Sequence, residues 1–129
     1  VISQFLGTLM LEEQVYVKNW FRENLKELNM VKNFIFSEIK ISPYLEINKN
    51  SLTGLGGFYI FLKLIHPSLK DSDEFSKKLI IAEGVILLPG HYFGINWKNY
   101  VRISFGNVTM DDAKEGFSRI NQFLTDFKK

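Results

Sequence analysis

The chain has 129 residues, of which 46% are hydrophobic, and this is enough for one domain with a substantial core. Sixteen basic and fourteen acidic residues leave a formal charge of +2 without a basic block, so no nucleic-acid partner is expected. Cysteine, a secretory signal and a membrane-length apolar run are all missing, which excludes disulfides and thiolate chemistry and predicts a soluble cytoplasmic protein without a membrane partner.

The first forty residues carry apolar side chains at helical spacing. Five of them open the chain: Ile2, Phe5, Leu6, Leu9 and Met10. A long amphipathic helix is then predicted from about Glu12 to Ile39, with a break near Asn29 or Asn33 as one option. Its apolar side includes Trp20 and Phe21, and we expect these aromatic residues to pack in a core and not to bind a cofactor.

A polar stretch follows Pro43. Residues 46–53 are rich in asparagine and lysine and are interpreted as a loop. Glycines come next, at positions 54, 56 and 57. Because neither a lysine–serine pair nor a helix follows them, a turn with positive φ or a close backbone approach is favoured over a phosphate site.

Alternation of side chains predicts a strand from Phe58 to Leu64. One face, expected to point into the core, carries Phe58, Ile60, Leu62 and Leu64. The other face carries Tyr59, Phe61 and Lys63.

The middle of the chain reads as a helix, a strand and an aromatic loop. Residues 71–74 provide capping oxygens and carboxylates for a helix that runs to Ala82 and is closed by Gly84. A short buried strand is predicted over Val85–Leu88, ended by a Pro-Gly pair. The aromatic loop from Pro89 to Lys98 either packs on the domain or borders a site, and its His91 is interpreted as a packed or surface residue.

The strand from Tyr100 to Phe105 places an arginine in apolar surroundings. Val101, Ile103 and Phe105 share one face, so Arg102 shares the other with Tyr100 and Ser104. If this strand lies beside the Phe58–Leu64 strand, Tyr59 joins Arg102 on one wall. The guanidinium then has two options, a ligand carboxylate or a structural acid of this protein.

A last helix is predicted to begin at a capping box, Thr109 to Asp112. The apolar stripe expected to be buried consists of Ala113, Phe117, Ile120, Leu124 and Phe127. The elements together predict an α+β fold, with a small mixed or antiparallel sheet backed by amphipathic helices. No pair of acids, Ser-His-Asp arrangement or metal-ligand spacing emerges, so the chain has no catalytic set of its own and no metal site is predicted.

The order of these pieces resembles the C-terminal small domain of class I/II aminotransferases, the fold-type I enzymes that depend on pyridoxal phosphate. The resemblance is carried by Gly-Gly-Phe-Tyr-Ile-Phe at 56–61, the segment 83–94 with Pro89-Gly90 and Phe93-Gly94, and Tyr-Val-Arg-Ile-Ser-Phe at 100–105. It implies that Arg102 binds the substrate α-carboxylate and that Tyr59 lies close to the bound substrate.

The same resemblance implies a fragment of a larger enzyme. The lysine that holds the cofactor, the aspartate on its pyridine nitrogen and its phosphate-binding residues belong to the family's large domain, and no lysine here has the matching surroundings. Residues 1–129 would then be one C-terminal domain, with residues 1–40 as the helical link to the large domain. Amino acids and 2-oxo acids would be the substrates, pyridoxal phosphate the cofactor, and a homodimer the form of the full-length enzyme.

Three alternatives stay open at this stage. An aminotransferase-like sensor domain of a transcriptional regulator and a related pyridoxal-phosphate synthase or lyase use the same frame. The third is a free-standing α+β interaction module in which Arg102 has a structural role.

Overall fold

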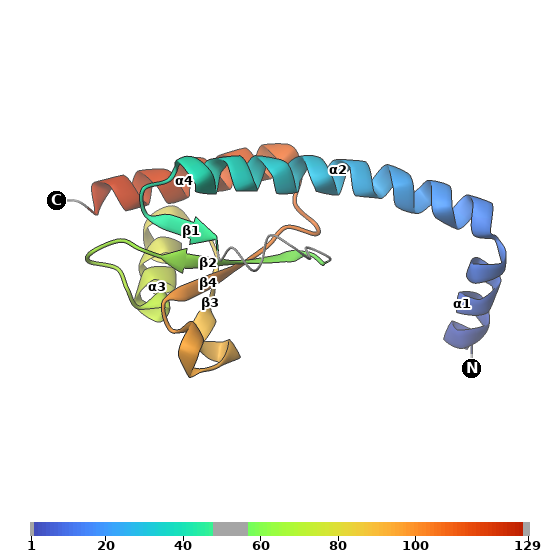
Figure 1. The fold of residues 1–129 in the computed structure, drawn as a ribbon, viewed down its shortest axis with the longest axis horizontal. Coiled ribbons are helices and arrows are strands. Elements are labelled where there is room, and N and C mark those ends of the chain that lie inside the picture. Colours follow the sequence, from blue (N-terminus) through green and yellow to red (C-terminus); the bar gives the residue numbers. More distant parts are fainter. Residues whose placement is uncertain (1, 48–56, 128–129) are drawn as a thin grey trace. The chain divides into compact units, whose positions relative to one another are not determined.

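The computed structural model describes residues 2–47 and 57–127, and its chain divides into two compact units, 1–30 and 31–129. The first unit consists of helix α1, Ile2–Glu12, and the first part of helix α2, Gln14–Ile41. The second contains the end of α2 and all later elements (Figure 1). Within the described ranges, no helix is both long enough and apolar enough to cross a membrane.

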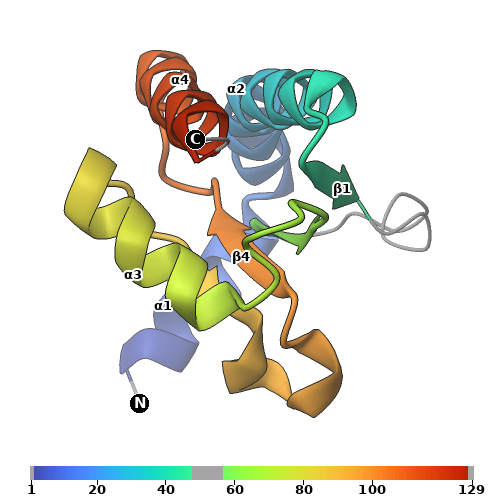
Figure 2. The same ribbon diagram turned by 90° about the vertical axis from the view of Figure 1, so that its left-hand side faces the viewer.

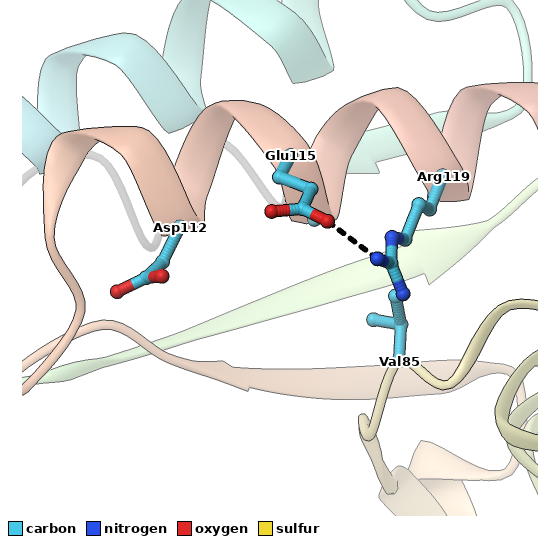
Figure 3. Close-up of a pocket in the computed structure, with 5 residues that line it drawn as sticks. Val85, Asp112, Glu115 and Arg119 are labelled. Carbon is cyan, nitrogen blue, oxygen red and sulfur yellow. Dashed lines mark hydrogen bonds and ion pairs between the residues drawn. The ribbon is translucent and has the colours of Figure 1, made fainter.

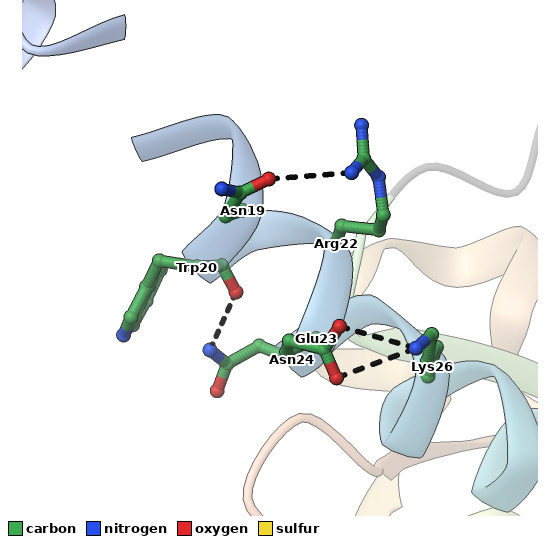
Figure 4. A network of polar contacts seen from close by, with 6 residues as sticks. All are labelled: Asn19, Trp20, Arg22, Glu23, Asn24 and Lys26. Atoms are coloured by element: carbon green, nitrogen blue, oxygen red, sulfur yellow. Dashed lines mark hydrogen bonds and ion pairs between the residues drawn. The ribbon is translucent and has the colours of Figure 1, made fainter. Parts of the chain in front are cut away.

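Helix α2 is continuous, so the break considered at Asn29 or Asn33 does not occur. Its polar side chains in the first unit form local hydrogen bonds along the helix (Figure 4). Arg22 donates to the Asn19 side chain, Lys26 to the Glu23 side chain, and Asn24 to the backbone carbonyl of Trp20. These local pairs support the helix but contribute little on an exposed surface.

Trp20 and Phe21 do not pack in a core of the described structure, so the expectation is wrong for these two residues. Trp20 is 52% exposed and Phe21 is 54% exposed. Burial in α2 starts only where the helix enters the second unit, with Val31, Ile35 and Ile39. The reason is that amphipathic periodicity identifies an apolar side without specifying what covers it.

The second unit is built on a four-stranded antiparallel sheet in the order β1-β2-β4-β3. Its strands are β1 Leu45–Ile47, β2 Tyr59–Leu64, β3 Leu88–Pro89 and β4 Tyr100–Ser104. The α+β class is therefore confirmed, and the sheet is antiparallel throughout.

Two parts of the sheet differ from the sequence prediction. The stretch interpreted as a loop from residue 46 begins within β1, because Glu46 pairs with Lys63 and Ile47 with Leu62. Residues 48–56, with Gly54 and Gly56, lie outside the described residues. Val85–Leu88 is not a buried strand: only Leu87 in it is buried, and pairing starts at Leu88.

Three helices pack on the core face of the sheet. The end of α2 and helix α4, Met110–Asp126, lie side by side over it (Figure 2), joined by Phe34 and Phe117 with ring centroids 6.1 Å apart. Helix α3, Ser72–Glu83, packs on α4 through Phe75 and Phe123. The sheet contributes Ile60, Leu62, Leu64, Val101 and Ile103, and Phe105 directly after β4 is buried with them, all as predicted. Phe58, also expected there, lies directly before β2 and is 51% exposed, so this expectation is wrong.

The predicted helix ends are confirmed. Asp71 caps α3 by accepting hydrogen bonds from the backbone N–H groups of Asp73 and Glu74, and Gly84 ends it in the left-handed conformation with φ 68°. Thr109 and Asp112 form the capping box of α4. The stripe of α4 is buried except at Phe127, which is half-buried and stacks on Phe123.

Candidate functional site

Strands β2 and β4 bring the polar and aromatic residues of their outer sides onto one surface. In the register of this pair, Tyr59 stands opposite Ser104, Phe61 opposite Arg102, and Lys63 opposite Tyr100. Directly opposed residues project to the same side of an antiparallel pair. These six residues, here named the Arg102 face, lie on the side away from the core helices, as the alternation of both strands predicted.

Arg102 lies at the centre of this face. Its strand β4 is flanked by β2 and β3, so that Phe61 is its cross-strand neighbour on one side and Leu88 on the other. The guanidinium carbon Cζ lies 4.3 Å from the ring centroid of Tyr59 and 4.8 Å from that of Phe93. The two rings attract the cation through the negative charge of their π faces.

No side-chain carboxylate of this chain pairs with Arg102. All fourteen aspartates and glutamates fall within residues 2–47 and 57–127, and the ion pairs found there involve Lys26, Lys63, Lys77, Lys78, Lys98, Lys114 and Arg119. In addition, the Nε of Arg102 is buried without a hydrogen-bond partner. The sequence left two partners open for the Arg102 guanidinium, a ligand carboxylate and a structural acid of this protein. The structure shows no structural acid in contact with it.

Phe93 reaches Arg102 from the aromatic loop. This loop forms two short 3-10 helices, η2 Gly90–Phe93 and η3 Ile95–Trp97. Gly94 between them has φ 128°, a backbone conformation that side-chain-bearing residues rarely adopt. At Gly90, a Cβ atom would lie 2.2 Å from the carbonyl oxygen of Trp97, so only glycine fits there. Both glycines are thus required for the path that brings Phe93 over the sheet.

The far end of the loop is tied to the start of helix α3. The N–H of Ser72 donates to the carbonyl oxygen of Lys98 at 3.0 Å, and the Nζ of Lys98 lies 3.3 Å from Asp71 Oδ2. Burial by itself raises the pKa of the Asp71 carboxyl, but hydrogen bonds from Asp73 and Glu74 and the Lys98 ammonium outweigh it, so this pKa lies below its ordinary value.

The aromatic loop packs on the second unit and also borders the Arg102 face, so its contacts fit both roles left open for it. Phe61 contacts Phe93 with ring centroids 5.1 Å apart and Trp97 at 5.0 Å, and Trp97 contacts Tyr100 at 4.8 Å. The sequence identified this loop by its aromatic content, but it did not identify Phe93 as a neighbour of Arg102. His91 is half-buried and stacks on Tyr92, in line with its interpretation as a packed or surface residue.

The Arg102 face does not by itself fit pyridoxal phosphate. Such a cofactor needs a lysine for its aldehyde and further donors for its phosphate. Lys63 is the lysine of this face, and its Nζ lies 3.9 Å from Glu46, with which it forms an exposed pair. Among the described residues, no cluster of three or more histidines or acids that could hold a metal ion is found either.

A hollow of about 260 Å³ on the helical side is a weaker candidate. It is lined by Val85, Asp112, Glu115, Gly116 and Arg119 (Figure 3). Arg119 is already paired with Glu115 and donates to the carbonyl oxygen of Glu83 at 2.8 Å, while Asp112 belongs to the capping box of α4. Its charged groups are thus accounted for by contacts within α4 and its cap and by the one bond from Arg119 to the end of α3.

Comparison with known proteins adds independent evidence. The family model for aminotransferase class I and II matches residues 4–120. The chain is 32% identical over 127 residues to the (5-formylfuran-3-yl)methyl phosphate transaminase of Methanocaldococcus jannaschii, covering 93% of this chain and 32% of that enzyme. It is 34% identical over 100 residues to an aspartate aminotransferase of Sulfurisphaera tokodaii, covering 72% of this chain and 23% of that enzyme.

Solved structures similar to this chain also include aminotransferases. The crystal structure of MJ0684 from Methanococcus jannaschii, described as similar in its active site to kynurenine aminotransferases, matches with a TM-score of 0.71 and 30% identity over 84% of this chain and 27% of that one. An aromatic aminotransferase from Pyrococcus horikoshii matches with a TM-score of 0.77 and 25% identity, over 88% of this chain and 28% of that one. The chain thus spans about a third or less of the proteins it matches.

Proposed function

Because the chain belongs to the class I and II aminotransferase family, we propose that it forms the substrate-carboxylate-binding part of a pyridoxal-phosphate-dependent enzyme that transfers an amino group between an amino acid and a 2-oxo acid. Arg102 is the residue that binds the substrate carboxylate, and Tyr59 lies beside it. The observation that carries this proposal is a half-buried arginine held by two aromatic rings and left without a carboxylate partner.

The chemistry of Arg102 suits this role. Its guanidinium stays charged at any working pH and presents a planar fork of N–H donors that matches the two oxygens of a carboxylate. A buried donor without a partner, such as its Nε, carries a desolvation cost that a bound ligand would relieve. The neighbouring rings of Tyr59 and Phe93 supply no carboxylate, so the charge remains available to a ligand.

Holding the carboxylate would contribute to the reaction through orientation. Fixing one end of an amino acid restricts its rotation, and the bond to be broken can then be presented to the reacting groups in a productive geometry. Those groups, together with the cofactor, are assigned to the part of the enzyme outside this chain, since the Arg102 face does not fit the cofactor by itself. On this view, the chain alone would not catalyse amino transfer.

The greater length of the related enzymes supports the assignment of the cofactor and the reacting groups to another part of the protein. The chain corresponds to 32% and 23% of the two enzymes compared above. We propose that residues 1–129 are one domain of a larger protein. From the resemblance of its motifs, this domain is proposed to be the C-terminal one, with residues 1–40 as its helical link. The exposed Phe5, Trp20 and Phe21 are what a link covered by another domain would present. The complete enzyme is proposed to be a cytoplasmic homodimer, and a chain without cysteine suits a reducing compartment.

The proposal is tested with the complete protein that contains this chain, purified and supplied with pyridoxal phosphate. A panel of amino acids serves as donors and a panel of 2-oxo acids as acceptors, and the new amino acid is measured. We expect amino transfer by the complete protein and none by residues 1–129 alone. A complete protein that binds the cofactor without transferring any amino group would favour the sensor, synthase or lyase alternatives.

A further inference from the structure

The contacts of Arg102 hold its side chain without using its hydrogen-bond donors. Its Cζ lies over the rings of Tyr59 and Phe93, at 4.3 Å and 4.8 Å from their centroids. An aromatic face attracts a cation but accepts no ordinary N–H···O bond. A structural acid in the same place would pair with the fork and neutralise the charge.

The two rings differ in what they are able to do. Tyr59 is 50% exposed and carries a hydroxyl, so it is able to contact a ligand directly. Phe93 has no polar side-chain atom, and any effect of its ring on a carboxylate must pass through Arg102. Its position is set from a second side by Phe61, whose ring meets it edge to face at 5.1 Å.

We propose that Phe93 is a positioning residue for Arg102, which keeps the guanidinium in one place with its donors free, so that a carboxylate meets a prearranged site. This inference rests on the proposed function of Arg102. The advantage is that of preorganisation: a flexible side chain that is already ordered loses less freedom when the ligand binds. The glycines of the Pro89-Gly90 and Phe93-Gly94 pairs contribute to this role, because the loop path that places the Phe93 ring over Arg102 requires them.

The test measures how well a carboxylate protects Arg102 from phenylglyoxal, a reagent that modifies arginine. Modification of each arginine is followed by peptide mass spectrometry while acetate is increased at constant ionic strength, with acetamide as the uncharged control. The chain contains three arginines, so Arg22 and Arg119 act as internal references in the same sample. The acetate concentration that gives half-protection of Arg102 serves as the measure of affinity.

Four forms are compared: wild type, Phe93→Leu, Phe93→Tyr and Tyr92→Leu. Tyr92 is the neighbour of Phe93 in η2 and is 67% exposed, and its ring stacks on His91, so it is the matched control. We expect acetate to protect Arg102 in the wild type, Phe93→Tyr and Tyr92→Leu at similar concentrations. Phe93→Leu should need about 3- to 30-fold more acetate, the usual contribution of a cation–π contact converted at tenfold per 1.4 kcal/mol.

The remaining outcomes distinguish a failure of the Phe93 role from a failure of the carboxylate site. Equal half-protection in Phe93→Leu and wild type would overturn the role of Phe93 and leave the carboxylate site standing. If Arg119, which is bonded to the Glu83 carbonyl, also becomes more reactive in Phe93→Leu, the residue is structural and the proposal fails. If acetate does not protect Arg102 in the wild type, the proposed carboxylate-binding role of Arg102 fails, and the inference with it.

Discussion

Phe61 of β2 stands directly opposite Arg102 of β4, and its ring contacts Phe93, which lies over the Arg102 guanidinium. Arg102 thus has Phe61 as its cross-strand neighbour and a ring over its guanidinium from the loop that follows β3. This relationship links the strand register and the aromatic loop to the position of the Arg102 charge.

Replacing Arg102 should impair the complete enzyme strongly. Each charge-assisted hydrogen bond contributes about 1.5–3 kcal/mol, so losing a two-bond fork in Arg102→Ala should lower kcat/KM by about 100-fold or more. Arg102→Lys should recover part of the loss, since lysine keeps the charge but not the planar fork. Steady-state kinetics with one amino acid donor measures both.

Lys114→Ala is the control for loss of a positive charge, because Lys114 forms only an exposed pair with Asp111. Its kcat/KM should stay within about twofold of the wild type, as is usual for a surface substitution. An Arg102→Ala enzyme with unchanged KM and turnover would refute the assignment of the carboxylate to Arg102.

Adding a methyl group at Gly90 should disturb the loop that carries Phe93. The new Cβ would lie 2.2 Å and 2.5 Å from the carbonyl oxygens of Trp97 and Tyr100, so the backbone would have to move. We expect Gly90→Ala to lower the free energy of unfolding by about 1–3 kcal/mol, the usual cost of overpacking. Urea denaturation measures this change.

Gly116→Ala is the matched control in the same unit. Gly116 lies inside α4, and a Cβ there meets no atom within 4 Å. Because alanine is the better helix former, the free energy of unfolding should rise by about 0.5–1 kcal/mol. If both variants were equally stable, the close approach at Gly90 would not be a constraint on the fold.

Asp71 should make the stability of the second unit depend on pH. Its folded pKa is lowered, so its contribution is present above the ordinary pKa of 3.8 and is lost as the pH falls through the folded value. Asp71→Asn should therefore approach wild-type stability as the pH falls from 7 toward 2. At pH 7, Asp71→Ala should cost about 0.5–2 kcal/mol, the usual value of a helix cap. Chemical denaturation at a series of pH values measures these differences.

Asp111→Asn provides the comparison for Asp71. Asp111 also lies in the first turn of a helix, but its side chain is 95% exposed. Its substitution should change stability by less than about 0.5 kcal/mol at pH 7. A pH dependence shared equally by both variants would exclude a specific role for the Asp71 cap.

The apolar side of the first unit should make the isolated 129-residue chain associate. Ile2, Phe5 and Leu6 are all more than half exposed in α1, and surfaces of this kind are usually covered in a stable protein. Sedimentation or light scattering should detect species larger than a monomer, and Phe5→Ser combined with Leu6→Ser should reduce them. Ile81→Ser, which removes an 85% exposed residue of the second unit, is the control. A monomeric wild-type chain would instead favour a free-standing module.

The local patterns of this sequence determined the strand faces, the helix caps and the candidate site. Alternation separated Ile60 and Leu62 from Tyr59, and it placed Arg102 away from Val101 and Ile103, because side chains of a strand alternate whatever the neighbouring strand is. The caps at Asp71 and Thr109 could be read directly, since they are formed between residues two or three positions apart.

Only the tertiary structure decided which segments meet. Leu45–Ile47 is too short to show a period and became β1 by pairing with β2, while the apolar run Val85–Leu88 pairs only from Leu88. Within the described residues no acid pairs with Arg102, and Asp71, for example, pairs with Lys98 instead. Phe93 lies over Arg102 because an irregular loop places it there. Neither fact can be derived from local periodicity. Periodicity reports what each segment is able to bury, but pairing and contact are selected by the packing of the whole unit.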